Sequence, residues 1–562
     1  MKSKCDWRIA EAERAQVRDL AGQLDVHPIL ASILISRGYT TREEASRFLA
    51  PSVDALCDPL SLEGMAEAAG RIRRAKETSE RVLVFGDYDV DGIAGTALLT
   101  RALRRYGIAQ CDYGMPSRLK EGYGLGTDHV EEAKARGVSL IITVDNGISA
   151  HTAALKAREL GLDLIVTDHH LIDGELPPAV AVINPKRQPA SHPAADACGV
   201  AVAFHLARAL TGEIADLDLV ALGTIADIVP LRGENRDLVA AGLRVMRSNP
   251  RVGIRALMRV ANLNAGELRA EDIAFQLAPR INAGGRMGDG QDGLHLLLTE
   301  SRDEAEALAQ ELDAANEERR QLESETLEEA LRDLEDAFLP QHRSIVLARR
   351  GWHRGVIGIV ASRIQSTHYR PVILVALDEN GVGRGSARSI TGFNIAEALS
   401  ACDPHLEAYG GHAAAAGLTV REDRLDSFRD AFETEAARIL PSGELRRELH
   451  VDAQVGLSQI DSRLVAELEK LQPFGHANLA PLFCTFGAEP IPNSLRELRG
   501  GHLKTALRNG SKVMDAIGFR MGERLPELRD TPAIDIAFTP QFNTWRGETT
   551  VQLILKDIRP AG

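Results

Sequence analysis

The chain has few cysteines, few aromatic residues and no long apolar run. Its six cysteines among 562 residues form no Cys-x-x-Cys pair, which excludes a disulfide framework and a zinc knuckle and suits a reducing compartment. Aromatic residues make up 4%, and no apolar segment is long enough to span a bilayer. The basic N-terminus is not followed by an apolar core, so we expect no signal peptide. We therefore expect a cytoplasmic protein that binds no membrane.

The chain also lacks a net positive charge. Its 66 basic residues are outnumbered by 80 acidic ones, for a net charge of −14. This balance argues against a surface coated in basic residues, but it leaves room for a local basic groove. The length exceeds what one core supports, so we expect three or four domains in a soluble globular protein. No heptad seam is visible, which predicts a monomer.

Acidic residues follow one apolar segment, residues 82–85, that is typical of a buried parallel strand. Gly86 ends this segment, and Asp87, Asp89 and Asp91 follow at alternate positions. On an extended turn these carboxylates project to one side, and their mutual repulsion favours a bound divalent cation. For an Asp-x-Asp pair alone, a solvated acidic turn is the favoured interpretation.

Two later apolar segments, 138–144 and 162–167, end in the same way. The polar residues that follow them are Asp145, Asp168, His169 and His170. Helical patterns separate the segments, so we expect βαβ units and a parallel sheet whose strand ends meet at one edge. Three strand ends that carry carboxylate or imidazole groups favour a metal site over a solvated turn.

Asp227 lies alone in the apolar segment 221–231. Burying a carboxylate is costly unless it is paired or bound to a metal. By itself, Asp227 is best interpreted as a helix-terminal residue. Together with the three strand ends, it is a fourth source of metal ligands.

Two further segments have features of phosphate binding. Gly284 and Gly285 lie between Arg280 and Arg286, which suits a loop that offers N–H groups and guanidinium groups to phosphate. A tight turn with incidental arginines is an equally favoured interpretation. Residues 341–400 hold eight arginines, no lysine and only three carboxylates, which indicates planar recognition of phosphate.

The arginine-rich segment includes Ser386 and Arg388, at a predicted strand edge or turn. Beyond it, Gly410 and Gly411 precede His412 in a predicted glycine-rich turn. For that turn, a role in packing is about as well supported as a role in phosphate binding.

Changes in composition predict five segments. Residues 1–75 are expected to be helical and polar, and residues 76–300 to form one domain in which strands and helices alternate from about 80 to 230. Residues 301–340 have the spacing of a long amphipathic helix between two domains. Residues 341–440 form a second α/β domain, and residues 441–562 contain five short strands that fit an OB-type barrel, a fold that commonly binds single-stranded nucleic acid.

Several motifs occur together and in a familiar order. They are Asp87-Tyr-Asp89-Val-Asp91-Gly92, Pro116-Ser117-Arg118, Asp145-Asn146-Gly147, Asp168-His169-His170, Cys198-Gly199-Val200, Gly-Thr-Ile-Ala-Asp227, the segment from Pro279 to Arg286, and Gly410-Gly411-His412. The set resembles the DHH phosphoesterase superfamily and, within it, the RecJ family of single-stranded-DNA-specific exonucleases. The resemblance runs from about residue 75 to residue 558. It implies a DHH domain with a parallel sheet, a long helix, a second α/β domain of DHHA1 type and an OB-like barrel.

The resemblance also implies an activity: metal-dependent 5′-to-3′ hydrolysis of single-stranded DNA in repair and recombination, with two Mn²⁺ or Mg²⁺ ions. The implied metal ligands are Asp87, Asp89, Asp91, Asp145, His169 and Asp227, with Asp145 between the ions. The implied catalytic residues are Asp89, Asp91, Asp145, His169, His170 and Asp227, with Asp168 as a further residue that steadies the ligands. The implied phosphate-binding residues are Arg118, Arg280, Ser386, Arg388 and His412. Ligands that are mostly carboxylates independently favour Mn²⁺ or Mg²⁺ over zinc.

The implied partner is single-stranded DNA, with a single-stranded-DNA-binding protein and a helicase as candidate protein partners. Two alternatives stay open. One is a DHH phosphatase that acts on nanoRNA, cyclic dinucleotides or pyrophosphate, against which the β-rich C-terminal segment argues. The other is a scaffold that has lost its metals, against which the retained carboxylates and both histidines argue.

Overall fold

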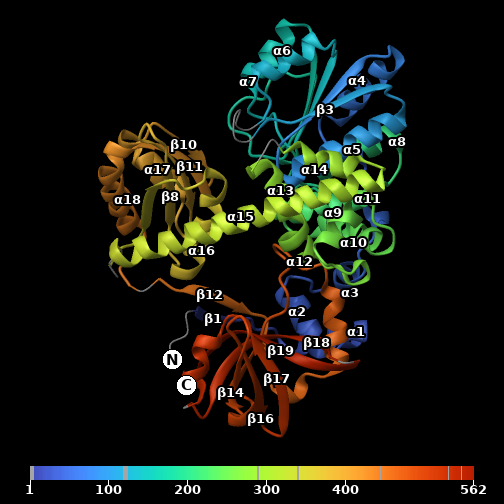
Figure 1. Cartoon of the computed structure of the whole chain (residues 1–562). Helices are drawn as coiled ribbons and strands as arrows, with labels where there is room; N and C mark the ends of the chain where they lie inside the picture. The colour runs from blue at the N-terminus through green and yellow to red at the C-terminus, as the bar shows by residue number, and fades with distance from the viewer. Residues whose placement is uncertain are drawn as a thin grey trace. The chain divides into compact units, whose positions relative to one another are not determined.

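The computed structural model in Figure 1 describes most of the chain. The described residues are 5–117, 124–287, 290–337, 341–443, 445–529, 531–545 and 547–561. The chain divides into two compact units. The larger comprises Cys57–Asp227 and Gly242–Leu445, and the smaller comprises Met1–Leu56, Ile228–Ala241 and Arg446–Gly562. Among the described residues, no helix has the length and apolarity needed to cross a bilayer.

The larger unit begins with a parallel five-stranded sheet. Its strands are β2 (Arg81–Gly86), β3 (Gln110–Gly114), β4 (Leu140–Val144), β5 (Asp163–Thr167) and β6 (Ala181–Ile183). The strand order is β3-β2-β4-β5-β6, and every neighbouring pair is parallel. The chain order reverses between β2 and β4, and open α/β sheets bind their ligands at such a switch point.

Helices cover this sheet. They are α4 (Met65–Glu77), α5 (Val90–Tyr106), α6 (Thr127–Ala135), α7 (His151–Glu159) and α8 (Gly199–Thr211), and α9 (Leu217–Ala226) packs against α5 and α8. Leu83, Phe85 and Ile141 form one core with apolar residues of α6 and α7. Every residue of β4 is buried, which explains why it reads as a continuous apolar run rather than an alternating one.

A group of helices follows the sheet and ends in a long one. These are α10 (Gly233–Ser248), α11 (Val252–Val260), α12 (Ala270–Asp272), α13 (Ala278–Met287), α14 (Gln291–Leu298) and α15 (Arg302–Ala337). The 36-residue α15 packs against α11, α13 and α14 and also against α16 (Arg354–His368) of the next domain. This arrangement confirms the predicted long helix between two α/β domains.

The loop predicted around Gly284 and Gly285 is wrong, because both glycines lie inside helix α13. Neither residue has a positive φ. A Cβ atom on Gly284 would lie 3.1 Å from the side chain of Leu312 on α15, and one on Gly285 would lie 3.4 Å from the carbonyl oxygen of Tyr88. The two glycines therefore serve close packing of a helix rather than a turn.

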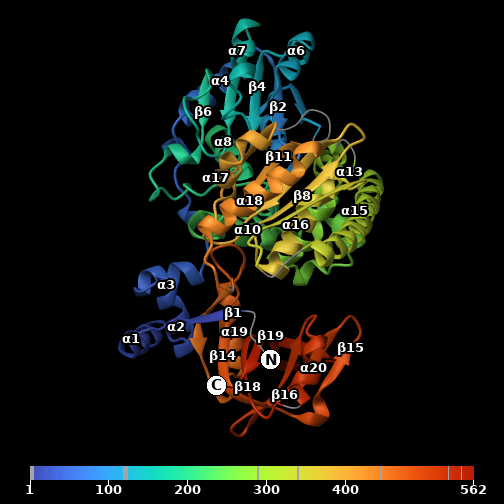
Figure 2. The same cartoon turned by 90° about the vertical axis from the view of Figure 1, so that its left-hand side faces the viewer.

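The second domain of the larger unit contains a mixed sheet. Its strands are β7 (Ile345–Arg350), β8 (Val372–Leu377), β9 (Val382–Arg388), β10 (Ala408–Gly411) and β11 (Ala415–Arg421), in the order β10-β11-β9-β8-β7. Only the β7–β8 pair is parallel. Helices α17 (Ile395–Ala401) and α18 (Leu425–Ile439) share a core with one face of the sheet, and α16 packs against β8 and β9 (Figure 2).

The smaller unit contains a closed barrel. Its five main strands are β14 (Phe483–Pro490), β16 (His502–Asn509), β17 (Lys512–Gly518), β18 (Ile534–Trp545) and β19 (Glu548–Pro560), with short β13 (Ala453–Gln454) and β15 (Arg496–Leu498) beside them. Pairing of β14 with both β18 and β16 closes the ring. The short helices α19 (Ser462–Leu468) and α20 (Leu525–Arg529) complete this part. The predicted OB-like barrel is confirmed.

The N-terminal residues share the core of this barrel. Helices α1 (Arg14–Leu24), α2 (Pro28–Ser36) and α3 (Arg42–Leu49) contribute Leu30, Ile33 and Leu34 to the cluster that holds Phe483 and Phe538. Strand β1 (Cys5–Ile9) pairs in parallel with β12 (Arg447–Val451). The N-terminal segment contains the expected helices, but α2 is apolar and buried rather than polar, and β1 is a strand. The five-segment division itself stays a prediction.

Candidate metal centre

The turn after β2 places two carboxylates at the start of helix α5. Asp89 is the N-cap of this helix, and its Oδ1 accepts the N–H groups of Asp91 (3.0 Å) and Gly92 (3.2 Å). Such a cap satisfies N–H groups that the first turn of a helix leaves without partners. Helix α5 therefore begins at Val90, directly after this cap.

Asp91 joins this turn to helix α8. Its carboxylate is 1% exposed and accepts the N–H groups of Gly199 (2.6 Å) and Val200 (2.8 Å) at the first turn of α8. A Cβ atom on Gly199 would lie 2.5 Å from Cβ of Asp145, so only glycine fits there. The motif Cys198-Gly199-Val200, to which the sequence pattern assigns no role, thus positions two of the predicted ligands.

His169 lies among three carboxylates that come from other elements. Its Nε2 atom is 3.0 Å from Oδ1 of Asp145, 3.8 Å from Oδ2 of Asp91 and 3.7 Å from Oδ2 of Asp227. Asp145 follows β4 in the left-handed region, at φ 64°, and is 2% exposed. The ends of β4 and β5 and the ends of two helices therefore meet at one point.

Asp227 is the C-cap residue of α9, so the helix-terminal interpretation of this residue describes its position correctly. Its carboxylate nevertheless lies with the other acidic groups. Burial, together with the charges of Asp91 and Asp89, raises the pKa of Asp227 to about 9. Burial and the charge of Asp89 also raise the pKa of Asp91 to about 7, and burial raises the pKa of Asp145 well above its usual value. These carboxylates cannot all ionise without a nearby positive charge.

Asp168 is fully buried and orients the two histidines that follow it. Its Oδ1 accepts the N–H of His169 (2.7 Å), the N–H of His170 (3.1 Å) and Nδ1–H of His170 (2.7 Å). Its Oδ2 accepts the N–H of Ile148 (2.9 Å). Burial acts to raise the pKa of Asp168, but the hydrogen bonds and charge of His170 outweigh it and the pKa is lowered.

The two histidines differ in their pKa. Burial, with the charge of His170, lowers the pKa of His169 to about 4, so its ring is neutral at pH 7. Burial also acts to lower the pKa of His170, but the hydrogen bond and charge of Asp168 outweigh it and the pKa is raised. A neutral imidazole can bind a metal through its lone pair, whereas a protonated one can donate a hydrogen bond.

The donor atoms form three overlapping groups, each with its atoms within 4.8 Å of one another. They are Asp87, Asp89 and Asp145; Asp91, His169 and Asp227; and Asp145, His169 and His170. Asp145 belongs to two of them. Carboxylates, among which Asp91, Asp145 and Asp227 have raised pKa values, and the neutral imidazole of His169 are a donor set that suits Mn²⁺ or Mg²⁺. These residues fit the predicted cations.

One further amide could not be anticipated from charge or periodicity. Asn146 is fully buried, and its Nδ2 donates to the carbonyl oxygens of Phe85 (3.2 Å) and Val144 (2.9 Å). It thereby ties the ends of β2 and β4 together. In the sequence, the feature that points to Asn146 is its position between Asp145 and Gly147 at the end of a predicted strand.

The predicted phosphate-binding residues lie in different places. Ser386 and Arg388 lie side by side on β9, with Nη1 of Arg388 donating to Oγ of Ser386 (3.0 Å). Arg280 is buried in α13, where its Nε donates to Asp313 (2.8 Å). His412 is exposed in the turn between β10 and β11. Arg118 lies outside the residues that the structure describes.

The arginine-rich segment is less available to phosphate than its composition suggests. Arg349 pairs with Asp333 (2.6 Å) and Arg363 pairs with Glu323 (2.7 Å), and both acids lie on α15. Arg350 pairs with Glu422. The opposing carboxylates come from outside the segment, so counting charges within it could not reveal them.

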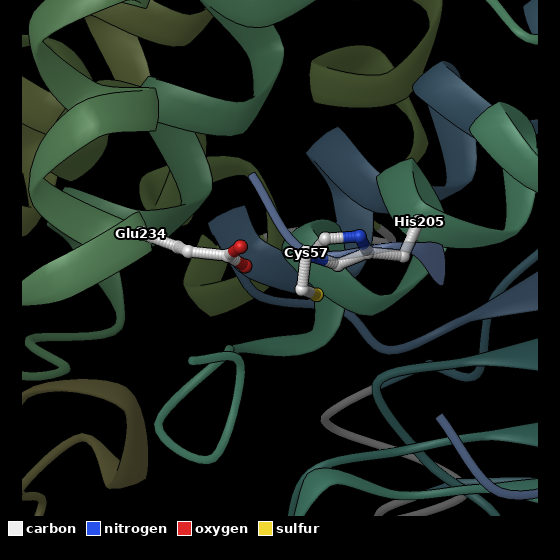
Figure 3. Close-up of side chains that lie close together, drawn as sticks. All are labelled: Cys57, His205 and Glu234. Atoms are coloured by element: carbon white, nitrogen blue, oxygen red, sulfur yellow. The ribbon is translucent and has the colours of Figure 1, made fainter. Parts of the chain in front are cut away.

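Figure 3 shows another set of side chains with possible ligand atoms. Within the larger unit, His205 is buried in α8, and the carbonyl oxygen of Cys57 accepts Nη1–H of Arg208 (3.1 Å). Glu234 in the same view belongs to the smaller unit. We assign no metal to these residues.

Three family models match the chain. The DHH family N-terminal domain matches residues 81–224, the DHHA1 domain matches residues 342–438 and the RecJ OB domain matches residues 451–557. The three matches follow the order of the parallel sheet, the mixed sheet and the barrel.

Whole-chain relatives show the same family. The single-stranded-DNA-specific exonuclease RecJ of Bacillus subtilis is 39% identical over 562 residues, which are 99% of this chain and 71% of that protein. The crystal structure of RecJ from Thermus thermophilus in complex with Mn²⁺ matches with a TM-score of 0.85 and 34% identity, covering 100% of this chain and 80% of that one. Its complex with Mg²⁺ matches with a TM-score of 0.79 and 32% identity, covering 100% and 79%. The chain therefore belongs to the RecJ family of single-stranded-DNA-specific exonucleases.

Proposed function

We propose that this chain is a metal-dependent exonuclease that hydrolyses phosphodiester bonds of single-stranded DNA from the 5′ end, in DNA repair and recombination. The observation that carries the proposal is the buried group around His169, whose Nε2 lies within 4 Å of Asp91, Asp145 and Asp227. Their raised pKa values indicate a site built to receive positive charge. Membership of the RecJ family supports the choice of substrate.

We assign two sets of ligands on either side of a shared Asp145. Asp87, Asp89 and Asp145 would hold one ion, and Asp91, His169 and Asp227 would hold a second, with Asp145 close to both. Two Mn²⁺ or Mg²⁺ ions held by these residues would supply an activated water and stabilise charge on the phosphate oxygens. The related Thermus structures contain Mn²⁺ and Mg²⁺, in keeping with this donor set.

The histidines have separate proposed tasks. His169, neutral at pH 7, would offer its Nε2 lone pair as a ligand. His170, whose protonated form Asp168 favours, would donate a hydrogen bond or a proton toward the oxygen that leaves phosphorus. Asp168 would fix the orientation of His170 rather than touch substrate.

Phosphates of the strand would contact a second set of residues. The proposed set is Arg118, Arg280, Ser386, Arg388 and His412. Among these, Ser386 and Arg388 present a hydroxyl and a planar guanidinium side by side, which suits a phosphate with several acceptor oxygens. Single-stranded DNA as the substrate would place the protein in the cytoplasm. A monomer that works beside a single-stranded-DNA-binding protein and a helicase is the form we propose.

Degradation of a synthetic strand tests this function. One oligonucleotide is labelled at its 5′ end and a second at its 3′ end, each as a single strand and as a blunt duplex, with Mn²⁺ or EDTA. We expect the 5′ label to be released first as a short product, and the 3′-labelled strand to shorten stepwise. Duplex and EDTA samples should stay intact.

The alternatives give different results in the same assay. A phosphatase for small substrates would leave the strand intact but hydrolyse a dinucleotide. A scaffold would do neither and would take up no Mn²⁺. Release of the 3′ label first would contradict the proposed direction.

A further inference from the structure

One face of helix α16 is made of small residues. Gly355, Gly358 and Ser362 are spaced by three and four positions, so they lie on the same side of the helix. At the first of these, Nη1 of Arg286 on α13 donates to the carbonyl oxygen of Gly355 (2.7 Å). A Cβ atom on Gly355 would lie 2.9 Å from the carbonyl oxygen of Arg286. This end of the face is therefore pressed against α13.

Helix α13 in turn approaches the turn that carries the candidate metal ligands. Gly285, next to Arg286, lies so near Tyr88 that an added Cβ atom would be 3.4 Å from the Tyr88 carbonyl oxygen. Tyr88 lies between Asp87 and Asp89. The face of α16 is thus linked through one helix to the acidic turn after β2.

The other end of this face meets the phosphate-binding pair on β9. Oγ of Ser362 donates to the carbonyl oxygen of Gly358 one turn earlier (3.0 Å), and it accepts Nε–H of Arg388 (3.1 Å). On its strand side, Nη1 of Arg388 donates to Oγ of Ser386 (3.0 Å) and to the carbonyl oxygen of Ala387 (2.8 Å). The guanidinium group is therefore held from the helix and from the strand at once.

Gly358 leaves the room that this arrangement needs. A Cβ atom there would lie 2.8 Å from Nη2 of Arg388 and 2.9 Å from Oγ of Ser386. Both distances are shorter than real Cβ contacts, so a methyl group would push the guanidinium or the hydroxyl away. Helix α16 is anchored independently of this contact, because Arg363 pairs with Glu323 on α15 (2.7 Å).

We propose that Ser362 is a positioning residue, which orients the guanidinium of Arg388 beside Ser386 for binding a substrate phosphate. The inference rests on the proposed function, because it takes phosphate as the ligand of Arg388 and Ser386. A guanidinium that is already oriented loses less conformational freedom when phosphate binds, and this preorganisation raises affinity without a contact between Ser362 and substrate.

The test compares four variants of the full-length protein. Ser362→Ala removes the acceptor of Arg388, Ser362→Thr keeps a hydroxyl, and Gly358→Ala adds the obstructing methyl group. Ser366→Ala is the matched control, because Ser366 is an exposed serine one turn further along the same helix. Each protein is assayed for kcat and KM on a single-stranded oligonucleotide with Mn²⁺, and for thermal unfolding.

Loss of one hydrogen bond that orients a charged group predicts a KM about 2- to 10-fold higher in Ser362→Ala, with kcat within about twofold of wild type. Gly358→Ala should raise KM at least as much, while Ser362→Thr and Ser366→Ala should match wild type. A KM of Ser362→Ala equal to that of Ser366→Ala would overturn the proposal. So would a loss of activity that simply follows a lower unfolding temperature.

A binding measurement separates this inference from the proposed function. The affinity of each variant for a fluorescein-labelled single strand is measured by anisotropy with Ca²⁺ in place of Mn²⁺. If wild type fails to hydrolyse the strand, the proposed function fails, whereas the affinities still report on Ser362. A weaker affinity for Ser362→Ala than for Ser366→Ala supports the positioning role, and equal affinities overturn it.

Discussion

Nε2 of His169 lies 3.0 Å from Oδ1 of Asp145, although the two residues follow different strands. The contact arises because β4 and β5 are parallel neighbours that end at the same edge of the sheet. Asp145 also belongs to the group that includes Asp87 and Asp89. One carboxylate thus links both halves of the candidate metal centre.

Replacing Asp145 with Asn should abolish activity with little change in shape. The amide keeps the size of the side chain but removes the charge that both proposed ions share, so kcat should fall by more than the roughly 10- to 100-fold typical of residues that only support a ligand. Rates of strand degradation with Mn²⁺ check this. The control is Asp128→Ala, an exposed aspartate on α6, which should retain wild-type rates. A kcat for Asp145→Asn within about tenfold of wild type would contradict the shared-ligand role.

Asp168→Asn should weaken the hydrogen bond and remove the charge that Asp168 offers to His170. Asn offers one acceptor oxygen where the carboxylate offers two, and its NH₂ group would face a backbone N–H. We expect the pKa of His170 to fall, because the hydrogen bond and charge of Asp168 raise it more than the charges of Asp89 and Asp91 do. We also expect a loss of about 1.5–3 kcal/mol in the free energy of unfolding, the usual cost of losing a hydrogen bond to a buried charge.

An NMR titration of the His170 ring in metal-free protein measures the first effect, and urea unfolding measures the second. An unchanged pKa of His170 in the variant would show that Asp168 is not its support.

The metal-free protein should lose stability as the pH rises from 7 to 9. The pKa of Asp227 is raised to about 9 in the folded protein, whereas in the unfolded chain it is near 3.8. Between these values the folded state binds more protons than the unfolded state, so stability falls as pH rises, by at most about 1.4 kcal/mol per pH unit for this group. His169, with its lowered pKa of about 4, contributes only below the pKa of an unfolded histidine and not in this window.

Thermal unfolding in EDTA at pH 7, 8 and 9 measures the decline. Asp227→Asn should make the decline shallower, and added Mn²⁺ should stabilise wild type most at pH 9. A stability that rises with pH in EDTA would contradict the assignment of buried, partly protonated carboxylates.

Gly199→Ala should weaken metal binding although Gly199 bears no ligand atom. Its methyl group would lie 2.5 Å from Cβ of Asp145 and would disturb the N–H group that Asp91 accepts. We expect the Kd for Mn²⁺ to rise about 10-fold or more. Gly70→Ala is the matched control, because nothing lies within 4 Å of the added atom on the exposed side of α4. Equal Mn²⁺ affinities for the two variants would show that Gly199 does not position the ligands.

The proximity of the metal-centre carboxylates and His169 could be predicted from the sequence because it follows from topology. Parallel strands that read as continuous apolar runs must be buried on both faces, and their carboxyl ends must share an edge. Asp87, Asp145 and His169 could therefore be placed together from the sequence alone. The groups that support these residues were harder to predict. The N–H groups of Gly199 and Val200, which donate to Asp91, belong to the backbone and cannot be recognised from a pattern of side chains.

Long-range packing explains the errors. In the sequence, Gly284 and Gly285 have the pattern of a turn. The structure shows instead that they leave room for the side chain of Leu312 and the carbonyl oxygen of Tyr88. Strand β1 pairs with β12 (Arg447–Val451), which is distant from it in the sequence, so the local sequence of β1 gives little sign of a strand. Arg363 lies in an arginine-rich segment of the sequence, but in the structure it forms an ion pair with Glu323 on α15.

The most direct test of the metal centre is the number of Mn²⁺ ions that the protein binds. Free Mn²⁺ is followed by electron paramagnetic resonance while it is titrated into metal-free wild type and into Asp145→Asn. The account predicts two ions for wild type and a loss of tight binding at both positions in the variant, because Asp145 is shared. Wild type that binds no ion or only one, or a variant that still binds two ions tightly, would contradict it.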